Sequence, residues 1–312
     1  MSKTFGLALG GGAARGWAHV GVLQGLKEMG VEPDVIAGCS IGALVGGAHL
    51  IGALEDFEAW ARELKPLSAL NAFTLKLHRG GFIDAEPAFE AFRSFDRNIE
   101  DLPKRFGAVA ADLGSGDEVW LTEGSVIDAA RASSAIPVVF HAVEREGRWL
   151  VDGALANPAP VSLARHLGAD IVLSVDLNAV PKVLDRFNPP PPGVPAMVDD
   201  KPLAPFTDAK SVPAAVERLI EDTRARVDRQ IQLYKARADA APHLFETAYA
   251  AAEIFQMHLA RAQAKTTPPD ILLEPDMRDA LPTAFDRADD FIAEGRRALL
   301  DQRAEIERLL AN

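Results

Sequence analysis

The chain has 312 residues, of which 48% are hydrophobic and 25% are charged, as in a globular protein that buries a sizeable core. Its formal net charge of −12 argues against nucleic acid as a partner and against electrostatic adhesion to anionic membranes, because both need a basic surface. The single cysteine, Cys39, excludes an internal disulfide framework and favours a reducing compartment.

Two units of strand, turn and helix open the chain. Residues 5–9 predict a short buried strand, and a glycine cluster at 10–16 and a helix at 17–29 follow it. Residues 35–37 predict the next strand and residues 40–50 its helix. This order predicts a parallel sheet with helices on its faces, and therefore an α/β fold. Further strands are expected at residues 106–112, 119–121, 149–151, 171–175 and 271–273.

Residues 35–54 contain no Asp, Glu, Lys or Arg, so a hydropathy scan would mark them as a membrane span of about 20 residues. Five glycines and His49 lie inside this stretch. We interpret it as a buried strand, a glycine turn and a buried helix, which also lack charges. The N-terminal residues carry no secretory signal, so we expect a cytoplasmic protein.

Prolines interrupt the α/β pattern after residue 178. Residues 179–206 include four consecutive prolines at 189–192 and predict an exposed, poorly ordered loop. Apolar residues at helical spacing over 216–234 predict an amphipathic helix, which either covers the core or forms a lid hinged on the proline segment. Residues 284–310 predict a second amphipathic helix, which closes the fold.

Residues 38–42, Gly-Cys-Ser-Ile-Gly, stand between a predicted strand and a predicted helix, where a hydrolase places a nucleophilic serine. Gly38 and Gly42 let the backbone turn sharply and let the helix approach the strand. The helix N-terminus behind Ser40 favours the negative charge that forms on oxygen during acyl transfer. Because G-x-S-x-G occurs by chance in roughly one chain in ten of this length, the prediction depends on the neighbouring motifs.

The glycine-rich turn at 10–16 has three interpretations. Its N–H groups cradle a phosphate, or they face an oxyanion beside Ser40, or the turn is only structural. The nucleotide interpretation is weakened because G-x-G-x-x-G is broken at Ala13 or Arg15 in each register, and no P-loop lysine follows.

Asp152 stands at the end of a predicted strand and is followed by Gly153. An Asp-Gly pair alone is most often a turn, but beside Ser40 and the glycine cluster Asp152 becomes a candidate general base at the sheet edge. A Ser-His-Asp triad is an alternative, with a third member in chain order at His166, His243 or His258. No His-x-x-x-His or clustered carboxylate spacing predicts a metal site.

Four stretches in this order, residues 7–23, 38–43, 130–137 and 150–161, resemble the patatin-like phospholipases, most closely the bacterial members related to the catalytic domain of neuropathy target esterase. The resemblance implies a three-layer α/β/α fold with a mainly parallel central sheet and a helical insertion or lid. It implies a single patatin-like domain over 1–312. The core would lie at 5–178 and 265–300, and residues 179–264 would form the proline-rich loop and helical insertion.

The resemblance also implies a Ser-Asp dyad, in which Ser40 attacks an ester carbonyl and Asp152 is the general base. The backbone N–H groups of Gly10, Gly11 and Gly12 supply the oxyanion hole. Arg15 braces this loop through ion pairing or carbonyl contacts.

Two details of this implied site need a physical argument. Many relatives have glycine at the position of Ala13, whose methyl group disfavours a positive φ. An aspartate with an ordinary pKa near 3.9 is a weak base, so we predict that apolar burial raises the pKa of Asp152.

We therefore predict a serine acyl-ester hydrolase for phospholipids or lysophospholipids that needs no metal or cofactor. We expect it in the cytoplasm, with transient contact at the inner face of the membrane. Two alternatives stay open: acyl transfer by the same dyad to an alcohol other than water, and a lipid- or partner-binding regulator with little turnover.

Overall fold

The computed structural model describes residues 3–63, 74–78, 81–84, 89–178, 244–277 and 284–311, with only the backbone at 74–78, 81–84, 138, 244–246, 248 and 249. The chain divides into two units, one formed by Met1–Val183 with Ala252–Asn312 and the other by Leu184–Ala251. The predicted proline-rich loop at 179–206 and the predicted helix at 216–234 lie outside the described residues. The predicted bounds of the insertion, 179–264, stay a prediction.

Within the described residues, eight strands of the first unit form one mixed sheet. Strands β11, β10, β1, β2 and β5 run parallel in this spatial order. Strands β6 and β9 pair antiparallel with β5, and β8 pairs antiparallel with β9. The strands are β1 (Phe5–Leu9), β2 (Val35–Cys39), β5 (Arg105–Asp112), β6 (Glu118–Leu121), β8 (Val143–Arg145), β9 (Arg148–Asp152), β10 (Ile171–Val175) and β11 (Ile271–Leu273). All seven strands expected from the sequence are therefore confirmed, and β8 is an addition.

A second, smaller sheet pairs three short strands that the sequence patterns do not predict, namely β3 (Thr74–His78), β4 (Gly81–Asp84) and β7 (Val138–Phe140). The α-helices are α1 (Trp17–Glu28), α2 (Ile41–Leu50), α3 (Leu54–Glu63), α6 (Val126–Ser133), α7 (Val161–His166), α9 (Leu244–Thr266), α10 (Ala288–Asp301) and α11 (Arg303–Leu310). Short 3₁₀ turns lie at η1 (Ala13–Gly16), η2 (Arg93–Phe95), η3 (Ile99–Asp101), η4 (Gly153–Leu155) and η7 (Phe285–Arg287).

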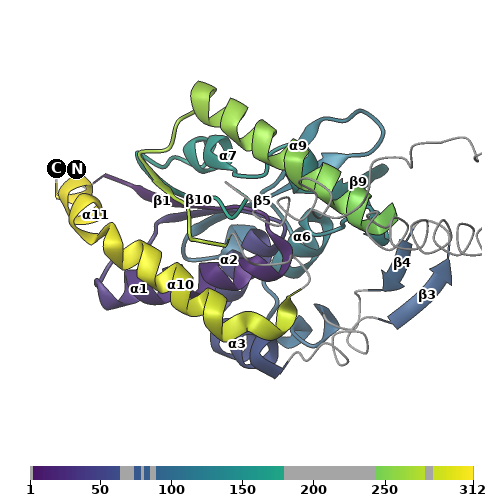
Figure 1. Cartoon of the computed structure of the whole chain (residues 1–312), viewed down its shortest axis with the longest axis horizontal. Coiled ribbons are helices and arrows are strands. Elements are labelled where there is room, and N and C mark those ends of the chain that lie inside the picture. The colour runs from purple at the N-terminus through teal and green to yellow at the C-terminus, as the bar shows by residue number, and fades with distance from the viewer. Residues whose placement is uncertain are drawn as a thin grey trace, which may run out of the picture. The chain divides into compact units, whose positions relative to one another are not determined.

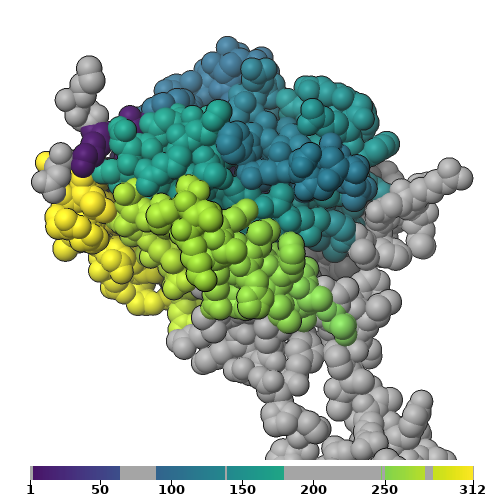
Figure 2. Space-filling model, turned by 90° about the horizontal axis from the view of Figure 1, so that it is seen from above, coloured from purple at the N-terminus to yellow at the C-terminus, as the bar shows by residue number. Residues whose placement is uncertain are grey.

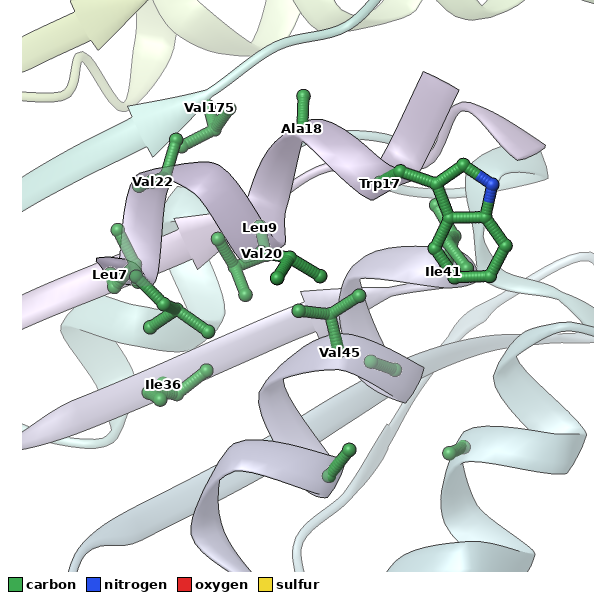
Figure 3. Close-up of a cluster of buried hydrophobic side chains, with 14 of the residues drawn as sticks. Leu7, Leu9, Trp17, Ala18, Val20, Val22, Ile36, Ile41, Val45 and Val175 are labelled. Atoms are coloured by element: carbon green, nitrogen blue, oxygen red, sulfur yellow. The ribbon is translucent and has the colours of Figure 1, made fainter. Parts of the chain in front are cut away.

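The central parallel strands β1, β2 and β10 are buried along their whole length, which explains why they are almost entirely apolar. Leu7, Leu9 and Ile36 point to one face and join the core formed with α1, α2 and α10 (Figures 1 and 3). Alternate residues such as Ala8 and Val35 point to the other face and pack with α7. Residues 252–266 of α9 lie beside α7 on this side (Figures 1 and 2). The sheet and its two helical layers confirm the three-layer α/β/α fold.

The charge-free stretch at 35–54 forms β2, a turn, α2 and the start of α3, as we interpret it from the sequence. No helix among the described residues is both long and apolar enough to cross a membrane. The C-terminal prediction of one helix over 284–310 is corrected: the chain forms η7, α10 and α11. The backbone at Gln302 leaves helical geometry, and Ile306 of α11 is fully buried.

Candidate active site

Ser40 occupies the sharp turn between β2, which ends at Cys39, and α2, which begins at Ile41. Its backbone has φ 53° and ψ −123°, a conformation that non-glycine residues rarely adopt and that costs about 1–3 kcal/mol. Hydrogen bonds hold this conformation: the Ser40 N–H donates to Ser133 Oγ at 2.8 Å, and the Ser40 carbonyl accepts from the N–H of Ala43 at 2.9 Å. The turn therefore stores strain at the residue that the sequence predicts as nucleophile.

Two glycines make this turn sterically allowed. A Cβ at Gly38 would lie 2.4 Å from the Ala43 Cα, and a Cβ at Gly42 would lie 2.1 Å from the Leu9 carbonyl oxygen. Both contacts are with backbone atoms, which cannot move aside without shifting β1 or α2. The helix thus approaches the strand as closely as the sequence pattern predicts.

The register of β5 brings Asp152 to Ser40. Cys39 of β2 pairs with Val109, and Asp152 of β9 pairs with the next residue, Ala110. Strand β6 pairs with residues 108–111 of β5 and so overlaps both partners. Strands β2 and β9 must therefore lie on the opposite edge of β5, where they meet end to end. Ser40, which comes just after β2, and Asp152, the last residue of β9, become neighbours for that reason.

Ser40 Oγ donates to Asp152 Oδ2 at 2.6 Å, and both residues are only 5% exposed. The other carboxylate oxygen, Oδ1, accepts from the Ala154 N–H at 2.8 Å. Burial raises the pKa of Asp152 from 3.8 to about 6, against the opposing effect of its hydrogen bonds with Ser40 and Ala154. The predicted rise in pKa is confirmed, and it makes this carboxylate a stronger base that is still ionised at neutral pH.

The close approach of the chain after β9 to strand β5 requires glycine at position 153. A Cβ there would lie 2.1 Å from the Val109 carbonyl oxygen of β5. The neighbouring thiol of Cys39 is buried, and burial raises its pKa well above the ordinary value. The Cys39 thiol therefore stays protonated, and the residue contributes packing at the end of β2.

The glycine loop corrects the predicted set of oxyanion donors. The N–H of Gly10 donates to the Val175 carbonyl and that of Gly11 to the Pro158 carbonyl, each at 3.0 Å. Among the described residues, the N–H groups of Gly12 and Ala13 find no acceptor. The donors available for an oxyanion therefore lie one residue further along the loop, at Gly12 and Ala13.

Ala13 adopts φ 49° in spite of its methyl group. This left-handed backbone costs a non-glycine residue about 1–2 kcal/mol. Ala13 lines the same cavity as Ser40. The methyl group therefore strains the loop without removing Ala13 from the site.

Buried polar side chains hold the carbonyl groups of the glycine loop. Arg15 Nε donates to the Gly12 carbonyl at 3.3 Å and Asn178 Nδ2 donates to the Gly11 carbonyl at 3.1 Å. His19 Nε2 lies 2.7 Å from the Gly10 carbonyl, and burial lowers its pKa to about 4. The neutral ring must donate here, because a carbonyl oxygen only accepts. Arg15 is only 1% exposed, so it braces the loop and does not face a substrate phosphate.

The described histidines do not form a Ser-His-Asp triad. The hydrogen-bond partners of Asp152 are Ser40, Ala154 and, through the Asp152 N–H, the Ala135 carbonyl. His166 stacks with Trp120 at a ring distance of 4.5 Å, and His243 lies outside the described residues. Over the described ranges, no three His, Cys, Asp or Glu side chains lie close enough together to hold a metal ion.

An apolar cavity of about 100 Å³ opens at Ser40 between α1, α2 and α3. A smaller cavity of about 30 Å³ shares Leu44, Phe57, Phe89 and Phe92 with it. The rings of Phe57 and Phe92, which line both cavities, lie 5.7 Å apart. The larger cavity is lined by Ser40 and by Ala13, Trp17, Ile41, Leu44, Phe57, Trp60, Phe89, Phe92, Ser134, Ile136, Phe140 and Phe285.

Three residues of this site lie outside the sequence prediction. Ser133 lies in the motif at 130–137, but its contact with the Ser40 N–H is visible only in the fold. Asn178 lies three residues after the end of β10 at Val175, and the region beyond the end of a parallel strand is a usable signal for a site residue. Glu253, whose carboxylate contacts Arg15, lies in no motif.

Comparison with known proteins gives a family and several relatives. A family model described as patatin-like phospholipase matches residues 7–165. An uncharacterized NTE family protein of Mycobacterium bovis is 41% identical over 179 residues, which are 57% of this chain and 50% of that protein. A patatin-like phospholipase domain-containing protein of Caenorhabditis elegans is 31% identical over 57% of this chain and 14% of its own length.

A lysophospholipase of Emericella nidulans is 29% identical over 57% of this chain and 12% of its own length. VipD from Legionella pneumophila, a solved structure, aligns with a TM-score of 0.46 and 12% identity over 97% of this chain and 67% of that one. The match with these relatives spans half of the mycobacterial protein and smaller parts of the worm and fungal ones. Because the family model covers slightly more than half of the 312 residues, the chain belongs to the patatin-like phospholipase family.

Proposed function

We propose that this protein is a serine acyl-ester hydrolase that cleaves phospholipids or lysophospholipids through an acyl-enzyme intermediate. The observation that carries the proposal is the buried hydrogen bond of 2.6 Å between Ser40 Oγ and Asp152 Oδ2, with Ser40 lining an apolar cavity. A serine and a base in direct contact, with the serine open to a cavity, are the parts that nucleophilic acyl transfer needs.

In the first half of the reaction, Ser40 Oγ attacks the ester carbonyl carbon while Asp152 accepts the hydroxyl proton. The tetrahedral intermediate carries its negative charge on the former carbonyl oxygen. Its collapse breaks the ester bond, and Asp152 returns the proton to the departing alkoxide. The acyl group stays on Ser40. Water then loses a proton to the same carboxylate and attacks the acyl carbonyl carbon; the acyl–Oγ bond of Ser40 breaks, Asp152 returns the proton to Ser40 Oγ, and the fatty acid leaves.

The oxyanion is stabilised by the N–H groups of Gly12 and Ala13, which have no acceptor among the described residues. A preorganised donor of this kind contributes about 3 kcal/mol to the transition state. The N-terminus of α2 behind Ser40 adds a favourable partial positive charge.

The acyl chain occupies the apolar cavity at Ser40, whose described walls are aliphatic and aromatic except for two serines. Family membership and the lysophospholipase name of a fungal relative support a lipid ester as substrate. The net charge of −12 disfavours adhesion to anionic lipid by charge. We place the protein in the cytoplasm, with transient apolar contact at the inner membrane face.

Reaction with a fluorophosphonate probe tests the proposal. We expect intact mass spectrometry to find one adduct on the wild-type protein and none on Ser40→Ala, because Ser40 Oγ is the atom that attacks the phosphorus of the probe. Ser40→Ala should also abolish hydrolysis of a lysophospholipid and leave the melting temperature within a few degrees. An adduct on Ser40→Ala, or folded wild-type protein without an adduct, would contradict the assignment.

Phe92 should limit the length of the acyl chain that fits. Its half-buried ring lines both cavities, so Phe92→Ala joins them into one longer apolar channel. We expect the ratio of kcat/KM for p-nitrophenyl decanoate over butyrate to rise roughly tenfold or more, because each newly buried methylene contributes about 0.8 kcal/mol.

Phe95→Ala is the matched control for Phe92→Ala. Phe95 is also half-buried and packs against the same core, but it lines neither cavity. This control should leave the chain-length ratio unchanged. An equal rise in both variants would mean that loosened packing, and not the joined channel, changes the preference.

A further inference from the structure

Helix α9 contributes one buried carboxylate to the glycine loop between β1 and α1. Glu253 Oε1 lies 2.6 Å from Arg15 Nη2, and the two side chains are 3% and 1% exposed. The same Nη2 donates to Asn178 Oδ1 at 2.7 Å. Glu253 lies outside residues 7–165, where the family model matches. It lies within helix α9.

The contacts of Arg15 and Asn178 fix two particular peptide groups. A peptide unit is planar and trans, so its carbonyl and its N–H point in opposite directions and turn together. Arg15 holds the Gly12 carbonyl, whose peptide carries the N–H of Ala13. Asn178 holds the Gly11 carbonyl, whose peptide carries the N–H of Gly12. These are the two N–H groups that find no acceptor among the described residues.

The carboxylate of Glu253 sets the position of the guanidinium in this network. A guanidinium is planar and donates in a fixed fork, so a contact at Nη2 constrains the direction of Nε. Without the carboxylate, the buried Arg15 would lose the one carboxylate that pairs directly with it among the described residues, and Asp176 would interact with it only through space. The guanidinium would then turn toward other acceptors or water and release the Gly12 carbonyl, and the Ala13 N–H would lose its direction.

We propose that Glu253 is a positioning residue for acyl transfer: through Arg15 and Asn178 it aims the N–H groups of Ala13 and Gly12 at the oxyanion. This inference rests on the proposed function, because it assumes that an oxyanion forms beside Ser40. Glu253 touches neither Ser40 nor Asp152 in this network, and its effect passes through the glycine loop alone.

Kinetics of Glu253→Gln on p-nitrophenyl butyrate test the proposal. The glutamine keeps the shape and removes the charge. We expect kcat to fall 10- to 100-fold with KM within twofold of wild type, because the oxyanion exists only in the transition state. The pH midpoint of kcat should stay near 6, because the surroundings of Asp152 are unchanged.

Two further variants separate positioning from general support of the fold. Arg15→Met/Glu253→Met removes both buried charges, so it should recover the melting temperature lost in Glu253→Gln but not kcat. Gln263→Ala loosens the same helix elsewhere, by removing a 2.8 Å hydrogen bond to the Ala156 carbonyl, and should leave kcat within threefold.

Folded Glu253→Gln with wild-type kcat would overturn the inference, as would a double variant that recovers both stability and kcat. The double variant decides the question if Glu253→Gln does not fold. A wild-type protein that neither hydrolyses esters nor forms a Ser40 adduct would instead overturn the proposed function, and the inference with it. An active wild type with an unaffected Glu253→Gln overturns the inference alone.

Discussion

Asp152→Asn should lower kcat by about 1,000-fold and at the same time make the folded protein more stable at neutral pH. The loss of activity follows because asparagine cannot accept the proton of Ser40 Oγ, which lies 2.6 Å from the carboxylate. The gain in stability follows because an ionised carboxylate is poorly solvated at this buried position, where burial raises its pKa to about 6.

The pH dependence of the two effects has opposite signs. Activity requires the carboxylate, so kcat/KM of the wild type should rise through pH 6 and level off above it. Stability depends on the proton: the folded state keeps it up to pH 6 and the unfolded state loses it near the ordinary value of 3.8. The wild type therefore loses about 2 kcal/mol between pH 4 and pH 7, a loss that Asp152→Asn does not suffer.

Urea unfolding at several pH values measures this difference. The stability of Asp152→Asn relative to wild type should grow by about 2 kcal/mol from pH 4 to pH 7. Asp170→Asn is a suitable control, because its exposed carboxylate only accepts from the Thr4 N–H and lies outside the site. If Asp152→Asn keeps more than about a tenth of the activity, Asp152 is not the general base.

The sequence predicts the chemistry of this site better than its geometry. Ser40 follows the apolar strand β2, and Asp152 ends β9 after Leu150 and Val151, so each has a local signal. Their contact depends on two strands meeting end to end along β5, and 112 positions of sequence separate the two residues. No local pattern contains that register. The four quoted motifs place both residues in one site only because a known family shares them.

Two of the three predicted oxyanion donors, Gly10 and Gly11, have their N–H groups already occupied for the same reason, whereas Gly12 stays available. The acceptors that occupy the N–H groups of Gly10 and Gly11 are the carbonyls of Val175 and Pro158, far along the chain. A glycine-rich pattern shows where donors are free to turn, but not which of them other strands and loops already use. Glu253 is harder still, because one glutamate in a long helix has no distinguishing spacing.

Some missed elements did have a local signal. Helix α3 carries Leu54, Phe57 and Ala61 at helical spacing between charged residues. The β8–β9 hairpin turns through Glu146 and Gly147, whose positive φ values of 53° and 78° belong to a two-residue turn. Strand β3, Thr-Leu-Lys-Leu-His, also alternates polar and apolar residues, which is a usable strand signal. Strands β4 and β7 lack such a signal, since they have four and three residues and no alternation.

The contact between α1 and α10 is a part of the fold that no sequence motif marks, and it gives the largest expected effect on stability. A Cβ at Gly21 would lie 1.9 Å from the Ile292 carbonyl oxygen, and a Cβ at Gly295 would lie 2.0 Å from the Ala18 carbonyl oxygen. The two helices therefore touch backbone to backbone at a glycine from each side. Helix α1 continues directly from the glycine loop, so this contact also holds the base of the candidate site.

Gly21→Ala should destabilise the protein by about 3 kcal/mol or more, because the new methyl group meets backbone atoms and α10 must move as a body. Gly25→Ala, one turn later in α1, is the matched control: its Cβ would meet only the Leu299 Cδ2, at 2.7 Å, which is the end of a flexible side chain. The gain in helix propensity of about 1 kcal/mol offsets that contact, so the unfolding free energy should change by less than about 1 kcal/mol. Equal losses of unfolding free energy in the two variants would mean that α1 tolerates no added volume anywhere along α10. The backbone contact at Gly21 would then contribute no more to stability than the side-chain contact at Gly25.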